Sequence, residues 1–161
     1  TDTPLGSGSG ITGHSNFLGE TPVVFYGSQE LVERYSGSFP ASLNGAAMLL
    51  PGSNSAMRSN VDRWLSRNQL NPDIKGEFDD TALMKAFAQQ GLGVFPAPKI
   101  IAEEVAKQHR VYQVGVAEPL TGRYYAISAE RKLKHPAVMR IIDHAQNNLF
   151  RDFFDSSEVQ L

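Results

Sequence analysis

The chain has 161 residues and a mass of 17.6 kDa, with 41% hydrophobic and 20% charged residues, the balance of a globular domain with a buried core. Its longest apolar run, Ala46–Leu50, is far below the roughly 18 residues that a membrane helix needs. Without cysteine there is no disulfide, thiolate metal site or cysteine nucleophile. A net charge of −2 with dispersed cations argues against a domain that binds nucleic acid by itself.

The N-terminal residues 1–15 are rich in glycine and serine and predict a flexible hinge. They lack the basic start and apolar stretch of a secretion signal, and we therefore expect a cytoplasmic protein. Gly8–Gly13 matches G-x-G-x-x-G literally. A dinucleotide site needs a strand before this motif and a helix after it, whereas here a strand-like segment follows. We expect no cofactor.

From residue 16 onward, strand and helix patterns alternate. Strands are predicted at residues 16–26 and 46–50, with a short helix at 29–35 between them. A second helix follows Pro51-Gly52 and three candidate N-caps, Ser53, Asn54 and Ser55. Its apolar face is formed by four side chains at helical spacing: Met57, Val61, Trp64 and Leu65. The opposite face, expected in solvent, carries Arg58, Asp62, Arg63 and Arg67.

The second half continues the alternation. Further strands are predicted at residues 73–78, 92–95, 111–116 and 124–129, with a turn at 118–122. Asp79 and Asp80 are candidate caps of a helix, and Gly91 is placed for its left-handed end. Pro98 suits the first position of another helix, and a last helix is predicted at 135–149. Such alternation predicts an α/β fold with a mostly parallel, doubly wound sheet, which binds ligands beyond the carboxyl ends of its strands.

The chemistry-bearing residues give few catalytic signals. No nucleophile elbow and no P-loop occurs, and the four histidines, at positions 14, 109, 135 and 144, lack metal-ligand spacing. Glu77, Asp79 and Asp80 form an acidic cluster that suits a hard cation such as sodium, although helix capping accounts for part of it. Ser53–Ser55 opens a helix after a buried strand, and both a polar ligand site and a plain cap remain open there.

Several segments together resemble the sensor domain of LysR-type transcriptional regulators, and in particular a sodium-responsive activator of that family. The resemblance runs from about residue 1 to residue 149 and is carried by four segments: Ala47–Gly52 (AMLLPG), Gly76–Phe87 (GEFDDTALMKAF), Gly91–Pro96 (GLGVFP) and Ala129–Ile141. Many regulators of the class share the Gly-Leu-Gly segment, whereas the Gly76–Phe87 string is much more specific.

The resemblance implies a type 2 periplasmic-binding-protein-like fold with a doubly wound mixed sheet. Residues 1–15 would be a crossing segment, 16–117 the second regulatory subdomain, 118–150 the return strand and closing helix of the first subdomain, and 151–161 a tail. DNA contact would come only through a helix-turn-helix absent from this chain, and we expect a homo-oligomer without membrane association. The implied contacts for a small-molecule or ion effector are Thr3, Pro4, Ser53, Asn54, Ser55, Phe78, Asp79 and Phe95.

This interpretation makes the chain a binding module without catalytic or metal-binding residues. Two alternatives stay open: a stand-alone small-molecule-binding module of the periplasmic type, and, less favoured, an α/β enzyme. No triple of nucleophile, base and orienting group stands out in the sequence, but a site assembled by the fold can escape sequence inspection.

Overall fold

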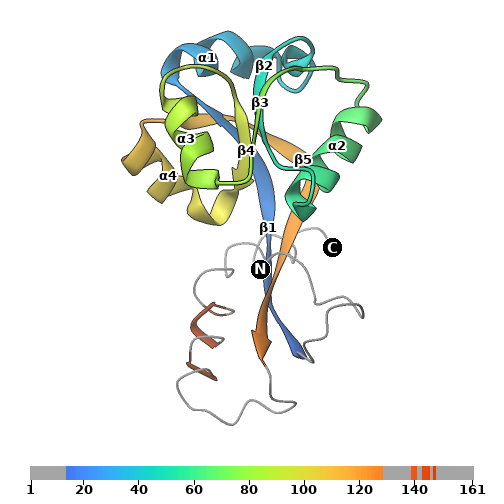
Figure 1. Cartoon of the computed structure of the whole chain (residues 1–161), viewed down its shortest axis with the longest axis vertical. Helices are drawn as coiled ribbons and strands as arrows, with labels where there is room; N and C mark the ends of the chain where they lie inside the picture. Colours follow the sequence, from blue (N-terminus) through green and yellow to red (C-terminus); the bar gives the residue numbers. More distant parts are fainter. Residues whose placement is uncertain (1–13, 129–138, 141–142, 146, 148–161) are drawn as a thin grey trace, which may run out of the picture. The chain divides into compact units, whose positions relative to one another are not determined.

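The computed structural model describes residues 14–128, 139–140, 143–145 and 147. The chain forms two compact units, residues 22–121 and residues 1–21 with 122–161. Both boundaries fall inside long strands, β1 (His14–Gly27) and β5 (Tyr112–Ser128), so each of these strands runs from one unit into the other (Figure 1). None of the described helices is long and apolar enough to cross a membrane.

The unit of residues 22–121 is built on a mixed sheet. Strands β4 (Phe95–Pro98), β1 and β5 are hydrogen-bonded in the order β4-β1-β5, with β4 antiparallel to β1. Strand β2 (Ala47–Pro51) pairs in parallel with β3 (Asp73–Phe78). Val94, the residue before β4, joins the two sets, because its carbonyl accepts from the amide of Leu49 at 2.8 Å.

One face of this sheet is covered by α1 (Gln29–Tyr35) and α2 (Ala56–Arg67). Because successive strand residues point to opposite faces, Val23 and Phe25 of β1 lie on this side. The Trp64 ring of α2 packs against Phe25 and Phe39, with ring centroids 5.7 and 6.2 Å away. This face therefore has an aromatic centre. Two short 3-10 turns, Ser36–Ser38 and Ala41–Leu43, complete the connection from α1 to β2.

The opposite face is covered by α3 (Thr81–Gln89), and α4 (Ala102–His109) lies next to α3. Here the alternate β1 residues Val24 and Tyr26 pack with Met84 of α3 and with Phe95. Helices on both faces of a mixed sheet confirm the predicted doubly wound α/β fold. The sheet is mixed rather than mostly parallel, because β1 and β4 run in opposite directions.

The helix at residues 29–35 and the strand at 73–78 are confirmed at the predicted bounds, and Gly91 has the expected left-handed φ of 80°. Pro98, however, ends β4, and a 3-10 turn (Lys99–Ile101) precedes α4. The predicted turn at 118–122 was also wrong, because β5 continues through it beside β1. Pairing along β1 and the Trp64 bond to the Glu118 carbonyl keep this Pro- and Gly-containing segment extended.

The predicted hinge at residues 1–15 and closing helix at 135–149 fall largely outside the described residues, and the tail at 151–161 does so entirely. Within the closing helix, Met139, Arg140, Asp143 and His144 have helical backbone, and the Asn147 amide donates to the Asp143 carboxylate at 2.8 Å.

Candidate functional site

The polar segments that follow β2 and β3 meet at one edge of the sheet. In the parallel pair, Pro51 lies opposite Phe78, and the amide of Gly52 donates to the Phe78 carbonyl at 2.9 Å. The turn that begins at Ser53 therefore lies beside the segment that begins at Asp79. Parallel strands present their carboxyl ends at the same edge of a sheet, so two segments about 25 residues apart in sequence form one surface.

Only one of the three candidate N-caps of α2 has that role. The Ser55 hydroxyl accepts from the amide of Arg58 at 3.4 Å and begins the helix. Ser53 and Asn54 form an exposed turn in front of it. Their side chains are not needed for capping, so they are available to a ligand at this edge.

On the β3 side, Asp79 and Asp80 have different roles. Asp80 caps α3, because its Oδ1 accepts from the amides of Ala82 at 2.9 Å and Leu83 at 3.4 Å. Asp79 is exposed, and its carboxylate lies directly over Gly52: a Cβ added at Gly52 would be 2.2 Å from the Asp79 Oδ1. The absence of a side chain at Gly52 thus leaves room for the Asp79 carboxylate in this position.

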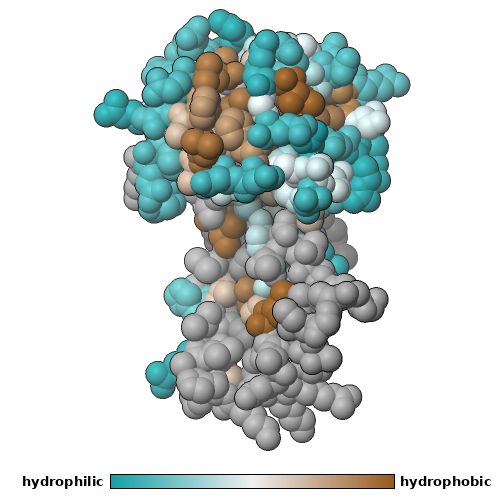
Figure 2. Space-filling model, viewed as in Figure 1, coloured by the Kyte–Doolittle hydropathy of each residue, from teal (hydrophilic) through white to brown (hydrophobic). Residues whose placement is uncertain are grey.

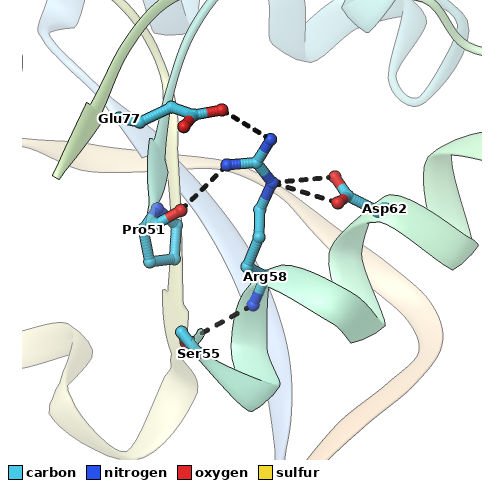
Figure 3. Close-up of polar contacts among 5 residues, drawn as sticks. All are labelled: Pro51, Ser55, Arg58, Asp62 and Glu77. Atoms are coloured by element: carbon cyan, nitrogen blue, oxygen red, sulfur yellow. Dashed lines mark hydrogen bonds and ion pairs between the residues drawn. The ribbon is translucent and has the colours of Figure 1, made fainter. Parts of the chain in front are cut away.

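Arg58 joins the ends of β2 and β3 (Figure 3). Its guanidinium donates to the Pro51 carbonyl at 3.0 Å, to both Asp62 carboxylate oxygens at 3.0 and 3.1 Å, and to Glu77 Oε1 at 2.8 Å. The Arg58 side chain is only 12% exposed. Burial lowers the pKa of the Arg58 guanidinium, but the hydrogen bonds to Glu77 and Asp62 outweigh this, and the pKa lies above its usual value.

This arrangement accounts for the acidic cluster. Glu77 is paired with Arg58 and Asp80 is a helix cap, which leaves Asp79 as the acidic side chain of the cluster without either role. Across the described part of the chain, no group of three or more His, Asp or Glu side chains is placed to hold a metal ion. The cluster seen in the sequence is therefore divided by the fold between structural tasks.

Of the remaining candidates that the structure describes, only Phe78 lies at this edge. Phe78 is partly buried at the end of β3, with its ring 5.4 Å from that of Phe87. Phe95 is fully buried in the core beside Tyr26, at 5.8 Å between ring centroids. Thr3 and Pro4 lie outside the described residues. Among the predicted contacts, the structure thus brings together Ser53, Asn54, Ser55, Phe78 and Asp79.

Sequence reasoning missed Arg58, which was expected in solvent. Its spacing of four residues from Asp62 predicts a local ion pair on the helix surface. The bonds to Pro51 and Glu77 depend on how α2 packs beside β2 and β3, and no local pattern signals them.

A profile of the LysR substrate binding domain family matches residues 12–149. The chain therefore belongs to this family, and its fold is similar to that of several solved regulatory domains. Among these, the regulatory domain of CcmR from Synechocystis PCC6803, in complex with 2-PG, superimposes with a TM-score of 0.66 at 16% identity and covers 91% of this chain and 70% of its own. The effector binding domain of QuiR, in complex with shikimate, gives a TM-score of 0.64 at 16% identity, over 89% of this chain and 68% of its own.

The chain is also similar in sequence to two curated proteins. The chain is 37% identical over 133 residues to the transcriptional activator protein NhaR of Escherichia coli (strain K12), and equally to that of Shigella flexneri. The matched region is 83% of this chain but 43% of each relative, so the chain spans less than half the length of the curated relatives it matches.

Proposed function

We propose that this chain is the effector-sensing part of a LysR-type transcriptional activator similar to NhaR. The proposal is supported by the membership of this chain in the LysR substrate binding domain family and by its 37% sequence identity to two activators named NhaR. Solved regulatory domains of the same fold are described with 2-PG and with shikimate, which supports a small-molecule effector. Because such a regulator acts on DNA, we propose a cytoplasmic location.

The observation that carries the proposal is the meeting of the β2 and β3 ends around Gly52. We place the effector contacts of this unit at Ser53, Asn54, Ser55 and Asp79, with Phe78 supporting the edge from behind. The exposed turn offers a hydroxyl and an amide next to the start of α2, where backbone N–H groups favour an anion or a polar group. Thr3, Pro4 and Phe95 stay predictions from the family resemblance.

The effector then acts by favouring one of two states of the regulator, which requires different affinities for those states. DNA contact would come from another segment of the intact regulator, since this chain has a net charge of −2 and dispersed cations. Effector binding and DNA binding are thus separate measurements.

Sodium is one effector to test. Calorimetry on the intact regulator compares sodium chloride with potassium chloride at equal ionic strength. Distinct heats for sodium would support a sodium response, and identical heats would reject it. Because Glu77 is paired with Arg58 and Asp80 caps α3, only the Asp79 carboxylate of the cluster remains at this edge, which favours a polar organic effector over a bare cation.

The site is tested by substitution in the intact regulator. A thermal-shift screen of small carboxylates and phosphates first identifies a stabilising compound. The variant S53A/N54A should weaken its binding by about tenfold, a loss of hydrogen bonds worth roughly 1.4 kcal/mol. The control Ser38→Ala, an exposed serine in the 3-10 turn after α1, should not change it. Unchanged binding in both variants would place the effector elsewhere.

We also propose that the regulator is a homo-oligomer that uses α3. Apolar atoms gather over this helix on the visible face (Figure 2). Leu83 and Phe87 occupy neighbouring turns of α3 and are 50% and 41% exposed, and Leu92 beyond its end is 47% exposed. Apolar groups of this size gathered on one face are typical of protein contacts. Light scattering on the intact regulator tests the oligomeric state.

The two alternative functions, a stand-alone binding module and an enzyme, predict different experimental results. A stand-alone binding module would bind the effector with no effect on the affinity of the intact protein for promoter DNA. An enzyme would convert the compounds that it binds, which chromatography of the screened mixtures would reveal. Either result would overturn the regulator proposal, whereas an effector-dependent change in DNA affinity would support it.

A further inference from the structure

A pocket lies between α2 and the middle of β5, away from the edge described above. It is half-open and has a volume of about 220 Å³. One side is formed by α2 through Asn60, Arg63, Trp64 and Arg67. The other is formed by three consecutive residues of β5, Pro119, Leu120 and Thr121.

The back of the pocket is held rigidly. Trp64 is 4% exposed, and its ring packs against both Phe25 and Phe39. Its indole N–H donates to the Glu118 carbonyl at 2.9 Å, which fixes the neighbouring Pro119–Thr121 segment against α2. The apolar walls are therefore in place before any ligand arrives, and a preformed site does not have to be ordered on binding.

The rim carries two positive charges. Arg63 and Arg67 are exposed and lie one turn apart on α2. Arg63 donates to the Asn60 side-chain oxygen at 2.8 Å, but in the described residues neither arginine forms an ion pair with a carboxylate. The other arginine of α2, Arg58, has two carboxylate partners. Like charges one turn apart repel each other, and an anion between them would remove that repulsion.

We propose that this pocket binds a small organic anion with a compact apolar body, at a second ligand site of the chain. The guanidinium groups of Arg63 and Arg67 hold the carboxylate, since their paired N–H donors match its two oxygens. Leu120, Pro119 and the Trp64 ring cover the apolar body. A cavity of roughly 150 Å³ holds one six-membered ring, so a volume of about 220 Å³ accommodates a ring with its carboxylate.

The second site is separate from the proposed effector edge. Asn60, the lining residue nearest to Ser55 along α2, lies five residues beyond it, about 7.5 Å at 1.5 Å per residue, and Arg67 lies 12 residues beyond it, about 18 Å. No side chain is shared between the pocket and the edge. Binding in the pocket can therefore be measured independently, and its failure would leave the effector proposal untouched.

The test uses the full 161-residue chain with cyclohexanecarboxylate as the probe. Two matched compounds accompany it: cyclohexanecarboxamide, which has the ring without the charge, and inorganic phosphate, which has charge without the ring. Trp64 is the only tryptophan of the chain, so a nitrogen–proton correlated NMR spectrum contains one indole N–H signal. This signal reports on the pocket directly. The carboxylate should bind by calorimetry and shift this signal, and the amide should bind at least about tenfold more weakly.

The variants separate a built site from general charge attraction. R63Q and R67Q should each weaken carboxylate binding by about tenfold. The control Arg34→Gln removes one positive charge from the exposed surface of α1 and should leave the affinity unchanged. Equal binding of carboxylate and amide, an unmoved Trp64 signal, or equal losses in R34Q and R67Q would each overturn the proposal.

Discussion

The two faces of the central sheet differ in how completely their helices cover them. On the α1–α2 face, Trp64 is 4% exposed and in contact with two other aromatic rings. On the α3 face, Met84 and Ala88 are buried, but Leu83 and Phe87 of the same helix remain half exposed. The same strands supply both faces through alternate residues, so the difference lies in the helices. The helices of the first face bury their large apolar side chains, whereas α3 leaves two large apolar side chains exposed.

The largest expected loss in the free energy of unfolding comes from a substitution on the α1–α2 face. Trp64→Ala should lower the free energy of unfolding by about 3–5 kcal/mol, because it leaves a cavity beside the rings of Phe25 and Phe39. The matched change on α3, Phe87→Ala, should cost about 1 kcal/mol or less. Urea unfolding at a concentration where the chain is monomeric measures both. Equal costs would mean that the two faces are covered alike.

A closer test of the packing around Phe39 uses glycine. A Cβ added at Gly115 of β5 would lie 2.4–2.7 Å from three ring atoms of Phe39. Gly115→Ala should therefore lower the free energy of unfolding by about 1–3 kcal/mol. Gly37→Ala is the control, since a Cβ there meets nothing within 4 Å. If the double variant F39L/G115A recovers most of the loss, the ring contact is the cause.

On the α3 face, Tyr26 should make the free energy of unfolding fall as the pH rises in the alkaline range. Its hydroxyl is buried without a hydrogen-bond partner among the described residues, and burial raises the pKa of Tyr26 to about 12. Tyrosine in the unfolded chain ionises near pH 10, so the unfolded state loses its proton first and stability falls as pH rises above about 10. Between about pH 7 and pH 11, wild type should lose about 1 kcal/mol more than Tyr26→Phe. An equal loss would contradict the burial of this hydroxyl.

The smallest effect on the folded monomer is expected from the surface of α3. Phe87→Gln should change the free energy of unfolding of the monomer by less than about 1 kcal/mol, because 41% of the side chain is already exposed. It should nevertheless weaken self-association of the intact regulator by about tenfold or more, measured by light scattering over a dilution series. Gln89→Ala, at an exposed position in the last turn of the same helix, is the control. An unchanged assembly in F87Q would exclude α3 as the contact.

The predicted elements that held have strong local signals. The helix at 29–35 and the strand at 73–78 were found at their predicted bounds, and Gly91 ends α3 with positive φ as its type suggested. Local signals failed at residues 118–122, where Pro and Gly are typical of a turn. There the hydrogen bonds along β1 and from Trp64 keep the chain extended, and these partners are about 50 or more residues away in sequence.

The residues of the candidate site also differ in whether the sequence could predict their roles. Ser53–Ser55 could be found because a buried strand followed by capping residues marks a strand end and a helix start. The different roles of Asp79 and Asp80 could not be told apart by residue type, because both carboxylates suit a cap or a ligand. The role of Arg58 could not be predicted from the sequence, because its partner Glu77 lies in β3, 19 residues further along the chain.

The sequence by itself determined the fold class, most elements and the family resemblance, because hydrophobic period, capping residues and specific strings are local properties of the chain. Tertiary structure decided which acidic groups were neutralised, which aromatic rings were buried and which arginines kept their charge unpaired. Those outcomes depend on packing between elements far apart along the chain, and desolvation and Coulomb forces act on distance in space.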